Sequence, residues 1–242
     1  MTTKRVYLLR HGQAEHNVAN DFSIHDANLT SLGRQQCVEF AEVDPSFQKI
    51  PEVILTSAFR RTLSTTLLAL PQAYTRLVSQ GKVILMPQLQ ETHDFPCDTG
   101  SDRAVLEATD EFKGLAAQGI DWNPLTDDWN KNEGFYAPTL EALMNRAKWV
   151  RNYVRSRPEK NILLVGHGGI FREIDGRSRS DDPVVVNALA RWGNVECRLY
   201  TFLSDDDEDA VMVPLLDPSS IDQVGKPADP HVNAELAAPP DN

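Results

Sequence analysis

Four short apolar runs, each the length of a buried strand, constrain the fold of this chain more than any other feature. They cover residues 6–9, 53–56, 83–86 and 162–165. Patterns typical of helices cover residues 31–42, 57–69, 105–117 and 139–157. Since strands and helices alternate along the chain, the sequence predicts a three-layer α/β/α fold, with a mostly parallel central sheet between two layers of helices.

The remaining segments are less regular. Residues 195–203 and 211–216 look like a pair of strands joined by an acidic turn. Residues 118–138 combine Trp, Asn, Asp, Gly and Pro without a clear period and indicate an irregular insertion. We therefore expect one catalytic domain over residues 1–226, followed by a flexible tail rich in Pro, Ala and Asp at residues 227–242.

The charge of the chain narrows its possible partners. With a formal net charge of −11 and a pI of about 5.0, the protein is poorly suited to bind nucleic acid or an anionic membrane. A phosphate site in such a protein has to gather its positive charge locally. The chain has no apolar segment of the signal-peptide kind and no apolar run long enough to span a bilayer, which predicts a cytoplasmic location.

The cysteines give no sign of a metal site or a disulfide framework. Cys37, Cys97 and Cys197 are odd in number and form no closely spaced pair. Zinc sites and disulfide frameworks usually show paired spacings, so neither is expected here.

The first strand ends in a segment suited to nucleophilic chemistry. Arg10, His11 and Gly12 follow the apolar run directly. An imidazole can attack phosphorus through one ring nitrogen when a hydrogen bond holds the other. A neighbouring arginine can bind phosphate oxygens, and glycine lets the backbone approach closely. Because such a triplet is as often a plain strand-end turn, it needs support from elsewhere in the chain.

Three more segments supply that support. Arg60 and Arg61 open a helix after the second strand, although such a basic pair is often only solvated. The stretch Gly-His-Gly-Gly at residues 166–169 follows the fourth strand, and glycine-rich turns from strand to helix commonly bind anions. The acidic loop at residues 89–94 offers a proton donor, although loop carboxylates often only face water.

Together these segments resemble the histidine phosphatase superfamily, in its phosphoglycerate-mutase-like branch, over residues 5–202. The matching residues are Arg10, His11, Gly12 and Asn17, then Leu29, Thr30, Gly33 and Gln36, then Ser57, Arg61, Thr62 and Thr65, and finally Leu89, Glu91 and His167. The resemblance implies a phosphoglycerate-mutase-like fold with a pocket of two histidines and two arginines around one phosphate. It also implies an enzyme that needs neither metal nor cofactor.

The resemblance assigns a role to each residue of the pocket. His11 is the implied nucleophile and becomes a phosphohistidine. Arg10, Arg61 and His167 are implied to bind the phosphoryl oxygens and to stabilise the transition state. Glu91 is the implied acid, which protonates the leaving group and then activates water. The implied phosphate-binding residues further include Gly12, Asn17 and Gly168.

The loop after Glu91 departs from the glycolytic mutases of the family. Those enzymes usually continue with Arg-His-Tyr-Gly, whereas this chain continues with Thr-His-Asp-Phe-Pro-Cys-Asp-Thr-Gly. The difference favours a phosphatase that hydrolyses a small phosphorylated metabolite. The alternatives are a phosphomutase, a non-hydrolytic reaction in the same pocket, or a non-catalytic binding module. Asp94 and Asp98 remain rivals of Glu91 for the acid, and the sequence leaves the substrate and the oligomeric state open.

Overall fold

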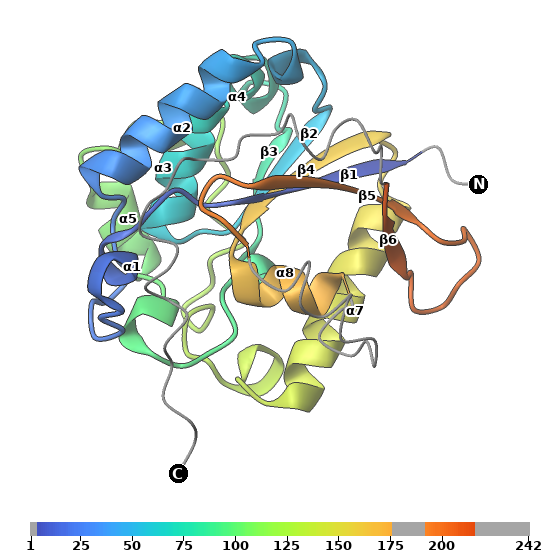
Figure 1. Ribbon diagram of the computed structural model, residues 1–242. Coiled ribbons are helices and arrows are strands. Elements are labelled where there is room, and N and C mark those ends of the chain that lie inside the picture. The colour runs from blue at the N-terminus through green and yellow to red at the C-terminus, as the bar shows by residue number, and fades with distance from the viewer. Residues whose placement is uncertain (1–3, 176–191, 216–242) are drawn as a thin grey trace.

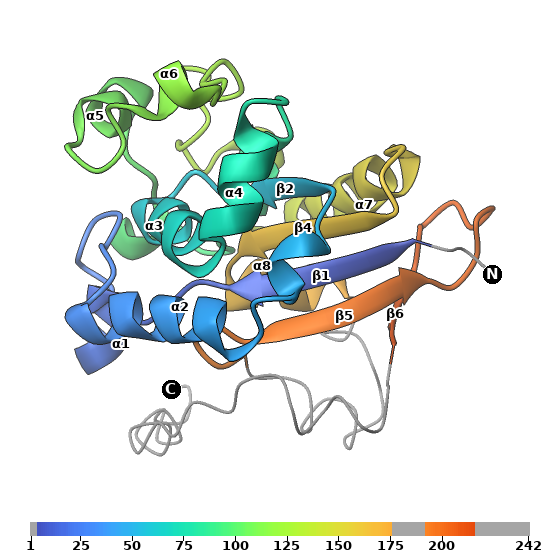
Figure 2. The same ribbon diagram turned by 90° about the horizontal axis from the view of Figure 1, so that it is seen from above.

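A six-stranded sheet forms the centre of the structure (Figure 1). It is seen in a computed structural model of the chain, which describes residues 4–175 and 192–215. The strands are β1 (Arg5–Arg10), β2 (Val53–Thr56), β3 (Val83–Leu85), β4 (Asn161–Gly166), β5 (Cys197–Phe202) and β6 (Met212–Pro214). Their order in the sheet is β3-β2-β4-β1-β5-β6, and Figure 2 shows the last five of them in this sequence. The pairs among β1 to β4 are parallel, whereas β5 and β6 are antiparallel to their neighbours, so the predicted mostly parallel sheet is confirmed.

Helices cover both faces of this sheet. They are α1 (Glu15–Ala19), α2 (Ser31–Val43), α3 (Arg60–Ala69), α4 (Pro71–Val78), α5 (Arg103–Ala108), α6 (Leu115–Gln118), α7 (Leu140–Ser156) and α8 (Gly168–Ile174). Short 3₁₀ turns lie at Phe47–Lys49, Pro87–Leu89, Pro96–Asp98 and Gly134–Tyr136. Figure 1 shows α2, α3 and α4 on one side of the sheet and α7 and α8 on the other, which confirms the three-layer α/β/α architecture.

The alternation of side chains along the strands explains the two helical layers. Tyr7 and Leu9 of β1 belong to the apolar cluster on the α3 and α4 side. Val6 and Leu8 belong to the cluster on the α7 and α8 side. All four are buried, and burying an aliphatic or aromatic side chain contributes roughly 1.5–3 kcal/mol relative to leaving it in water. A slip of one residue would exchange the two sets, so the register of β1 is strongly determined.

The register places three strand ends side by side. Arg10 of β1 pairs with Gly166 of β4, and Thr56 of β2 pairs with Val165 of β4. Because parallel strands end at the same edge of a sheet, the residues that follow β2, β4 and β1 lie next to one another there. The polar motifs predicted at these strand ends therefore converge on one place.

One helix predicted from the sequence was wrong, and one helix was missed. The helix predicted over residues 105–117 is broken between α5 and α6, where Thr109 is extended with φ −67° and ψ 132°. The break brings Leu106, Phe112 and Leu115 together in the same core, which one straight helix would not do. In addition, α4 was not predicted, although Pro71 at its first turn is a helix-start signal.

The predicted insertion over residues 118–138 is irregular, as expected, but it is packed into the core. Trp122, Leu125 and Trp129 are buried in the cluster that contains α3 and α4. The Trp129 ring meets the Phe59 ring edge to face, with 6.0 Å between centroids. The insertion therefore holds the loop before α3 in place. The predicted tail, residues 227–242, lies outside the described residues.

The described helices are all too short or too polar to cross a bilayer. The longest of them, α7, spans residues Leu140–Ser156 and carries several charged side chains.

Candidate active site

Two histidines meet at the shared edge of the sheet. His11 follows β1 and His167 follows β4, and their ring centroids lie 5.2 Å apart. The strand pairing continues into the site, because the His11 N–H donates to the Gly166 carbonyl over 3.1 Å. Both histidines are buried. The structure thus brings together the two histidines that the sequence singled out.

His11 is arranged to present a free ring nitrogen. Its Nδ1 lies 2.7 Å from the carbonyl oxygen of Gly12. A carbonyl can only accept, so Nδ1 carries the proton and Nε2 keeps its lone pair. Burial, followed by the positive charges of Arg61 and Arg10, lowers the pKa of His11 well below its usual value. A neutral imidazole with an unprotonated ring nitrogen is the form that attacks phosphorus.

His167 is held between Arg61 and Ser57. Arg61 Nε donates to His167 Nδ1 over 3.2 Å, so the proton of a neutral His167 sits on Nε2, which lies 3.0 Å from Ser57 Oγ. Burial, followed by the charge of Arg61, lowers the pKa of His167 well below its usual value. His167 therefore offers an N–H donor beside His11.

Arg61, and not Arg60, is the arginine of the pocket. Its guanidinium is buried, donates to the Cys97 carbonyl over 2.7 Å, and lies 4.7 Å from the centre of the Phe59 ring. Arg60 instead lies near Asp26, with 3.6 Å between Nε and Oδ2, and it is partly exposed. The structure thus places the arginine selected by the family motif next to His167.

Arg10 approaches the site from the end of β1. Its side chain runs past Gly168, where an added Cβ would lie 3.6 Å from Arg10 Nε. Its Nη1 donates to the carbonyl of Trp192. Arg10 therefore passes within van der Waals distance of the start of α8.

The remaining motif residues support the loop that carries His11. The Gly12 N–H donates to Thr65 Oγ1 over 3.1 Å, and a Cβ on Gly12 would come within 2.6 Å of the Gly33 carbonyl oxygen. Gln36 Oε1 accepts from the Gln13 N–H over 2.9 Å. Residues of the Leu-Thr and Ser-Arg elements thus hold the backbone next to His11 in place.

Asn17 makes its described contacts within its own turn. Its Oδ1 accepts from the Ala14 N–H over 3.0 Å, and its Nδ2 lies 3.0 Å from His16 Nε2. The structure therefore shows Asn17 contacting His16, and its implied contact with phosphate remains a prediction.

Glu91 occupies the amino-terminal end of α8. Its Oε1 accepts from the Ile170 N–H at 2.9 Å and from the Thr92 N–H at 3.0 Å, and its Oε2 accepts from the Gly169 N–H at 3.1 Å. The N–H groups of the glycine-rich turn that we expected to face an external anion thus face the protein's own carboxylate. Oε2 accepts only one of these bonds, so it is the oxygen better able to carry a proton.

The two rival carboxylates lie in different environments. Asp98 is buried, with its Oδ1 3.5 Å from Arg61 Nη2 and its Oδ2 3.6 Å from His93 Nδ1. The hydrogen bond to Asp98 raises the pKa of His93. Asp94 is exposed, and none of its contacts among the described residues reaches a predicted pocket residue. Asp98 therefore remains the stronger rival of Glu91.

Two residues near the site were missed by the sequence analysis. His16 is buried with its ring centroid 6.0 Å from that of His11, but in the sequence it stands in the spacer between Gly12 and Asn17. Arg146 of α7 is buried and donates to the Glu91 carbonyl over 2.9 Å. Burial lowers the pKa of Arg146 to about 10. The helical period could have flagged Arg146, because it falls near the apolar stripe of α7.

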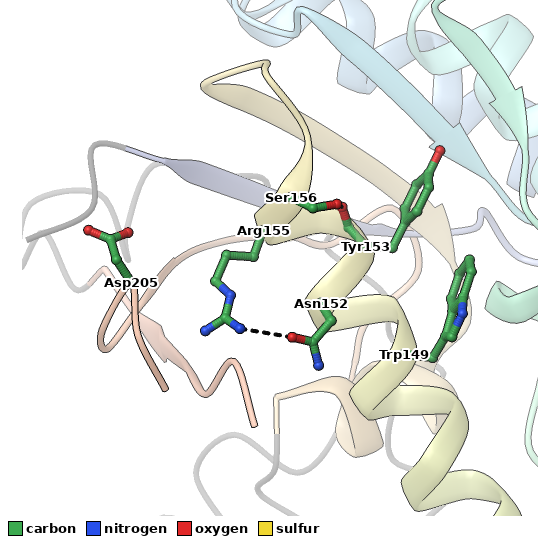
Figure 3. Close-up of a pocket in the computed structure, with 6 residues that line it drawn as sticks. All are labelled: Trp149, Asn152, Tyr153, Arg155, Ser156 and Asp205. Carbon is green, nitrogen blue, oxygen red and sulfur yellow. Dashed lines mark hydrogen bonds between the residues drawn. The ribbon is translucent and has the colours of Figure 1, made fainter. Parts of the chain in front are cut away.

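A surface hollow elsewhere on the protein is separate from this site (Figure 3). It is lined by Trp149, Asn152, Tyr153, Arg155, Ser156 and Asp205. These residues come from the end of α7 and the turn after β5, near the starts of β1 and β4, whereas the histidines follow the ends of those strands. The hollow therefore lies at the opposite edge of the sheet and adds nothing to the histidine site.

Metal ligands are not gathered at the site. Within residues 4–175 and 192–215, no group of three or more His, Cys, Asp or Glu side chains is placed to hold a metal ion.

Comparison with known proteins assigns the family. A model of the histidine phosphatase superfamily (branch 1) matches residues 6–174. The chain belongs to this superfamily, which confirms the resemblance seen in its motifs. Relatives include a probable phosphatase of Schizosaccharomyces pombe, 29% identical over 187 residues, covering 75% of this chain and 83% of the relative. A 2,3-bisphosphoglycerate-dependent phosphoglycerate mutase of Corynebacterium glutamicum is 38% identical over 205 residues, covering 75% and 81%.

Further comparisons agree with this assignment. The glucosyl-3-phosphoglycerate phosphatase of Mycobacterium tuberculosis is 27% identical over 205 residues, covering 80% of this chain and 83% of the relative. A solved structure of the mycobacterial glucosyl-3-phosphoglycerate phosphatase with VO3 matches with a TM-score of 0.53 and 22% identity, covering 88% and 98% of the two chains. The Entamoeba histolytica phosphoserine phosphatase matches with a TM-score of 0.53 and 17% identity, covering 88% and 95%. The structural matches show the shared fold, and the family makes the chain an enzyme of the phosphatase class.

Acid should destabilise the folded chain through its buried histidines. Burial and nearby arginines lower the pKa values of His11, His16 and His167, that of His16 to about 3, whereas an unfolded imidazole binds a proton near pH 6.5. As the pH falls below about 6.5, the unfolded state therefore takes up more protons, and the free energy of unfolding decreases. Replacing His16 with Gln should make this decrease shallower by up to about 1.4 kcal/mol per pH unit.

Urea unfolding, followed by tryptophan fluorescence between pH 7 and pH 4.5, measures these slopes. The same change at the exposed His25 controls for the loss of a histidine as such. Equal slopes in the wild type and the His16→Gln variant would contradict the lowered pKa of His16.

Proposed function

We propose that this enzyme is a phosphatase that hydrolyses small phosphorylated metabolites through a phosphohistidine formed on His11. The observation that carries the proposal is the neutral His11, with Nδ1 held by the Gly12 carbonyl and Nε2 left free. Its neighbours are the arginines and the second histidine that phosphoryl transfer requires. A cytoplasmic location fits a small metabolite as substrate.

In the first step, His11 Nε2 attacks the phosphorus of the monoester. The N–P bond forms while the bond between phosphorus and the leaving oxygen breaks. Arg10 and Arg61 supply positive charge to the phosphoryl oxygens, and the Nε2–H of His167 can turn from Ser57 to one of them. Such catalysis is mostly positioning and electrostatic stabilisation.

In the same step, Glu91 gives its proton to the leaving alkoxide. In the second step, the resulting carboxylate takes a proton from water, the oxygen of that water attacks phosphorus, and the N–P bond breaks to restore His11. The position of Glu91 supports this role, because Arg146 and the N–H groups of Gly169 and Ile170 hold it at the edge of the sheet that carries His11. Oε2 accepts one hydrogen bond and can carry the proton.

A phosphoglycerate mutase is the second candidate. The Corynebacterium glutamicum mutase, at 38% identity, favours it. The loop after Glu91 disfavours it, since the chain lacks the Arg-His-Tyr-Gly sequence that the glycolytic enzymes usually have there. We therefore place hydrolysis first.

Replacing His11 with Ala should abolish turnover while leaving the fold intact. The loss should be on the order of a thousandfold or more, because the variant lacks the proposed nucleophile of the covalent intermediate. Rapid quench of the wild type with substrate should give protein-bound phosphate that is labile to acid and stable to alkali. His25→Ala is the matched control, and wild-type turnover in the His11→Ala variant would rule out the mechanism.

Activity should survive removal of divalent metal ions. Arg10 and Arg61 supply the positive charge that a metal would otherwise provide at the phosphoryl group. Phosphate release should be the same with and without EDTA, and vanadate should inhibit it by mimicking the transferring group. Loss of activity in EDTA with recovery in magnesium would show that a metal takes part.

Replacing Glu91 with Gln should slow alkyl phosphates far more than aryl phosphates. An alkoxide needs protonation to leave, whereas p-nitrophenolate needs little, so the difference should be about a hundredfold or more. Phosphohistidine formation is followed in single turnovers, so that its later hydrolysis does not mask the effect.

Asp98→Asn is the competing variant in this experiment, and the exposed Asp94→Asn is the control. If Asp98→Asn slows alkyl phosphates more than aryl phosphates and Glu91→Gln slows both equally, Asp98 is the acid and Glu91 is not.

The enzyme should convert little 3-phosphoglycerate into 2-phosphoglycerate, even when primed with bisphosphoglycerate. The reason is the missing Arg-His-Tyr-Gly sequence after Glu91. Phosphorus NMR of the reaction mixture separates isomerisation from release of inorganic phosphate. Rapid isomerisation would select the mutase instead.

A further inference from the structure

One buried ring nitrogen of His16 has no hydrogen-bond partner within residues 4–175 and 192–215. The side chain lies on α1, just after the loop that carries His11, and it is only 6% exposed. Its ring centroid is 6.0 Å from that of His11. Its Nδ1 is buried and makes no hydrogen bond with any described part of the protein.

The neighbouring Asn17 determines which nitrogen of His16 carries the proton. Asn17 Oδ1 accepts from the Ala14 N–H, so the Nδ2 amine of Asn17 is the group that faces His16 Nε2, at 3.0 Å. An amine can only donate, so Nε2 of His16 must accept, and the proton of a neutral ring must sit on Nδ1. Nδ1 of His16, the nitrogen without a partner among the described residues, is therefore a hydrogen-bond donor.

A buried donor without an acceptor destabilises the protein unless something else accepts its hydrogen bond. The site beside His16 is suited to an anion, because the charges of Arg61 and Arg10 both act on the His16 ring. We propose that the Nδ1–H of His16 donates to an oxygen of the phosphoryl group bound at His11, and that Asn17 is the positioning residue that fixes this tautomer. The proposal rests on the proposed function, since it adds a donor to that same phosphate site.

The donor acts as a neutral group. Burial, followed by the charges of Arg61 and Arg10, lowers the pKa of His16 to about 3. The arginines thus supply the positive charge of the site. His16 supplies one directed hydrogen bond and adds no further positive charge beside the arginines. A neutral donor also leaves the nearby His11 free to stay neutral.

Binding of inorganic phosphate, measured by isothermal titration calorimetry, tests the donor without any turnover. Replacing His16 with Leu keeps an apolar volume and removes the N–H, so the dissociation constant should rise about 10- to 100-fold, as for a lost hydrogen bond to a charged group. Replacing His16 with Asn, whose amide nitrogen can lie near the position of Nδ1, should restore most of the affinity. His25→Leu, at an exposed position, is the matched control and should bind phosphate like the wild type.

Nitrogen-15 NMR of the histidine rings gives a second readout that does not depend on the Leu variant folding. The signals missing in His16→Asn identify His16, and they should show a proton on Nδ1 that shifts when inorganic phosphate is added. A proton on Nε2, or an Nδ1–H signal unmoved by phosphate, would overturn the proposal.

The calorimetric outcomes are equally distinct. Equal phosphate affinity in His16→Leu and the wild type would mean that water accepts the hydrogen bond of the donor. If phosphate affinity fell in His16→Leu and stayed low in His16→Asn, only packing would have been lost. Either result refutes the donor while leaving phosphohistidine formation on His11 untouched. Absence of phosphohistidine would instead refute the proposed function, whatever His16 does.

Discussion

The parallel pairing of β2, β4 and β1 is the constraint on which the rest of the site depends. β4 lies between the other two, with Gly166 opposite Arg10 and Val165 opposite Thr56. The two apolar faces of these strands are packed under helices, so a register shift would bury the wrong side chains. The same register that fills the core therefore determines how far apart His11 and His167 lie.

The positive charge of the site comes from its arginines, while the two buried histidines stay neutral. Buried Arg61 donates to the Cys97 carbonyl and to His167, and it lies near Asp98, so its polar groups are satisfied before substrate arrives. Burial, followed by the charge of Arg61, lowers the pKa values of His11 and His167. A protein of net charge −11 can thus place two guanidinium groups beside an imidazole that stays neutral.

The sequence predicted most of what depends on local pattern. Short apolar runs that end in polar motifs predict the strand ends and place His11 close to His167, because such runs suit few structures other than buried strands. The apolar period of residues 140–156 predicts the helix α7. The break between α5 and α6 could not be predicted, since it depends on where Leu106 and Phe112 find space in the core. His16 could not be predicted either, because its importance comes from a ring position 6.0 Å from His11 and not from any spacing.

The glycine-rich turn after β4 shows most clearly why a motif needs its three-dimensional context. Free N–H groups at such a turn suggest an anion from outside, yet the group that accepts their hydrogen bonds is the side chain of Glu91. Gly169 permits this approach, since a Cβ at that position would collide with Glu91 Oε1. Arg146 of α7, which lies on the same side of the sheet as α8, completes the arrangement by donating to the Glu91 carbonyl. The turn therefore positions the carboxyl group of Glu91, and in our proposals the phosphoryl group is bound by side chains: the arginines, His167 and His16.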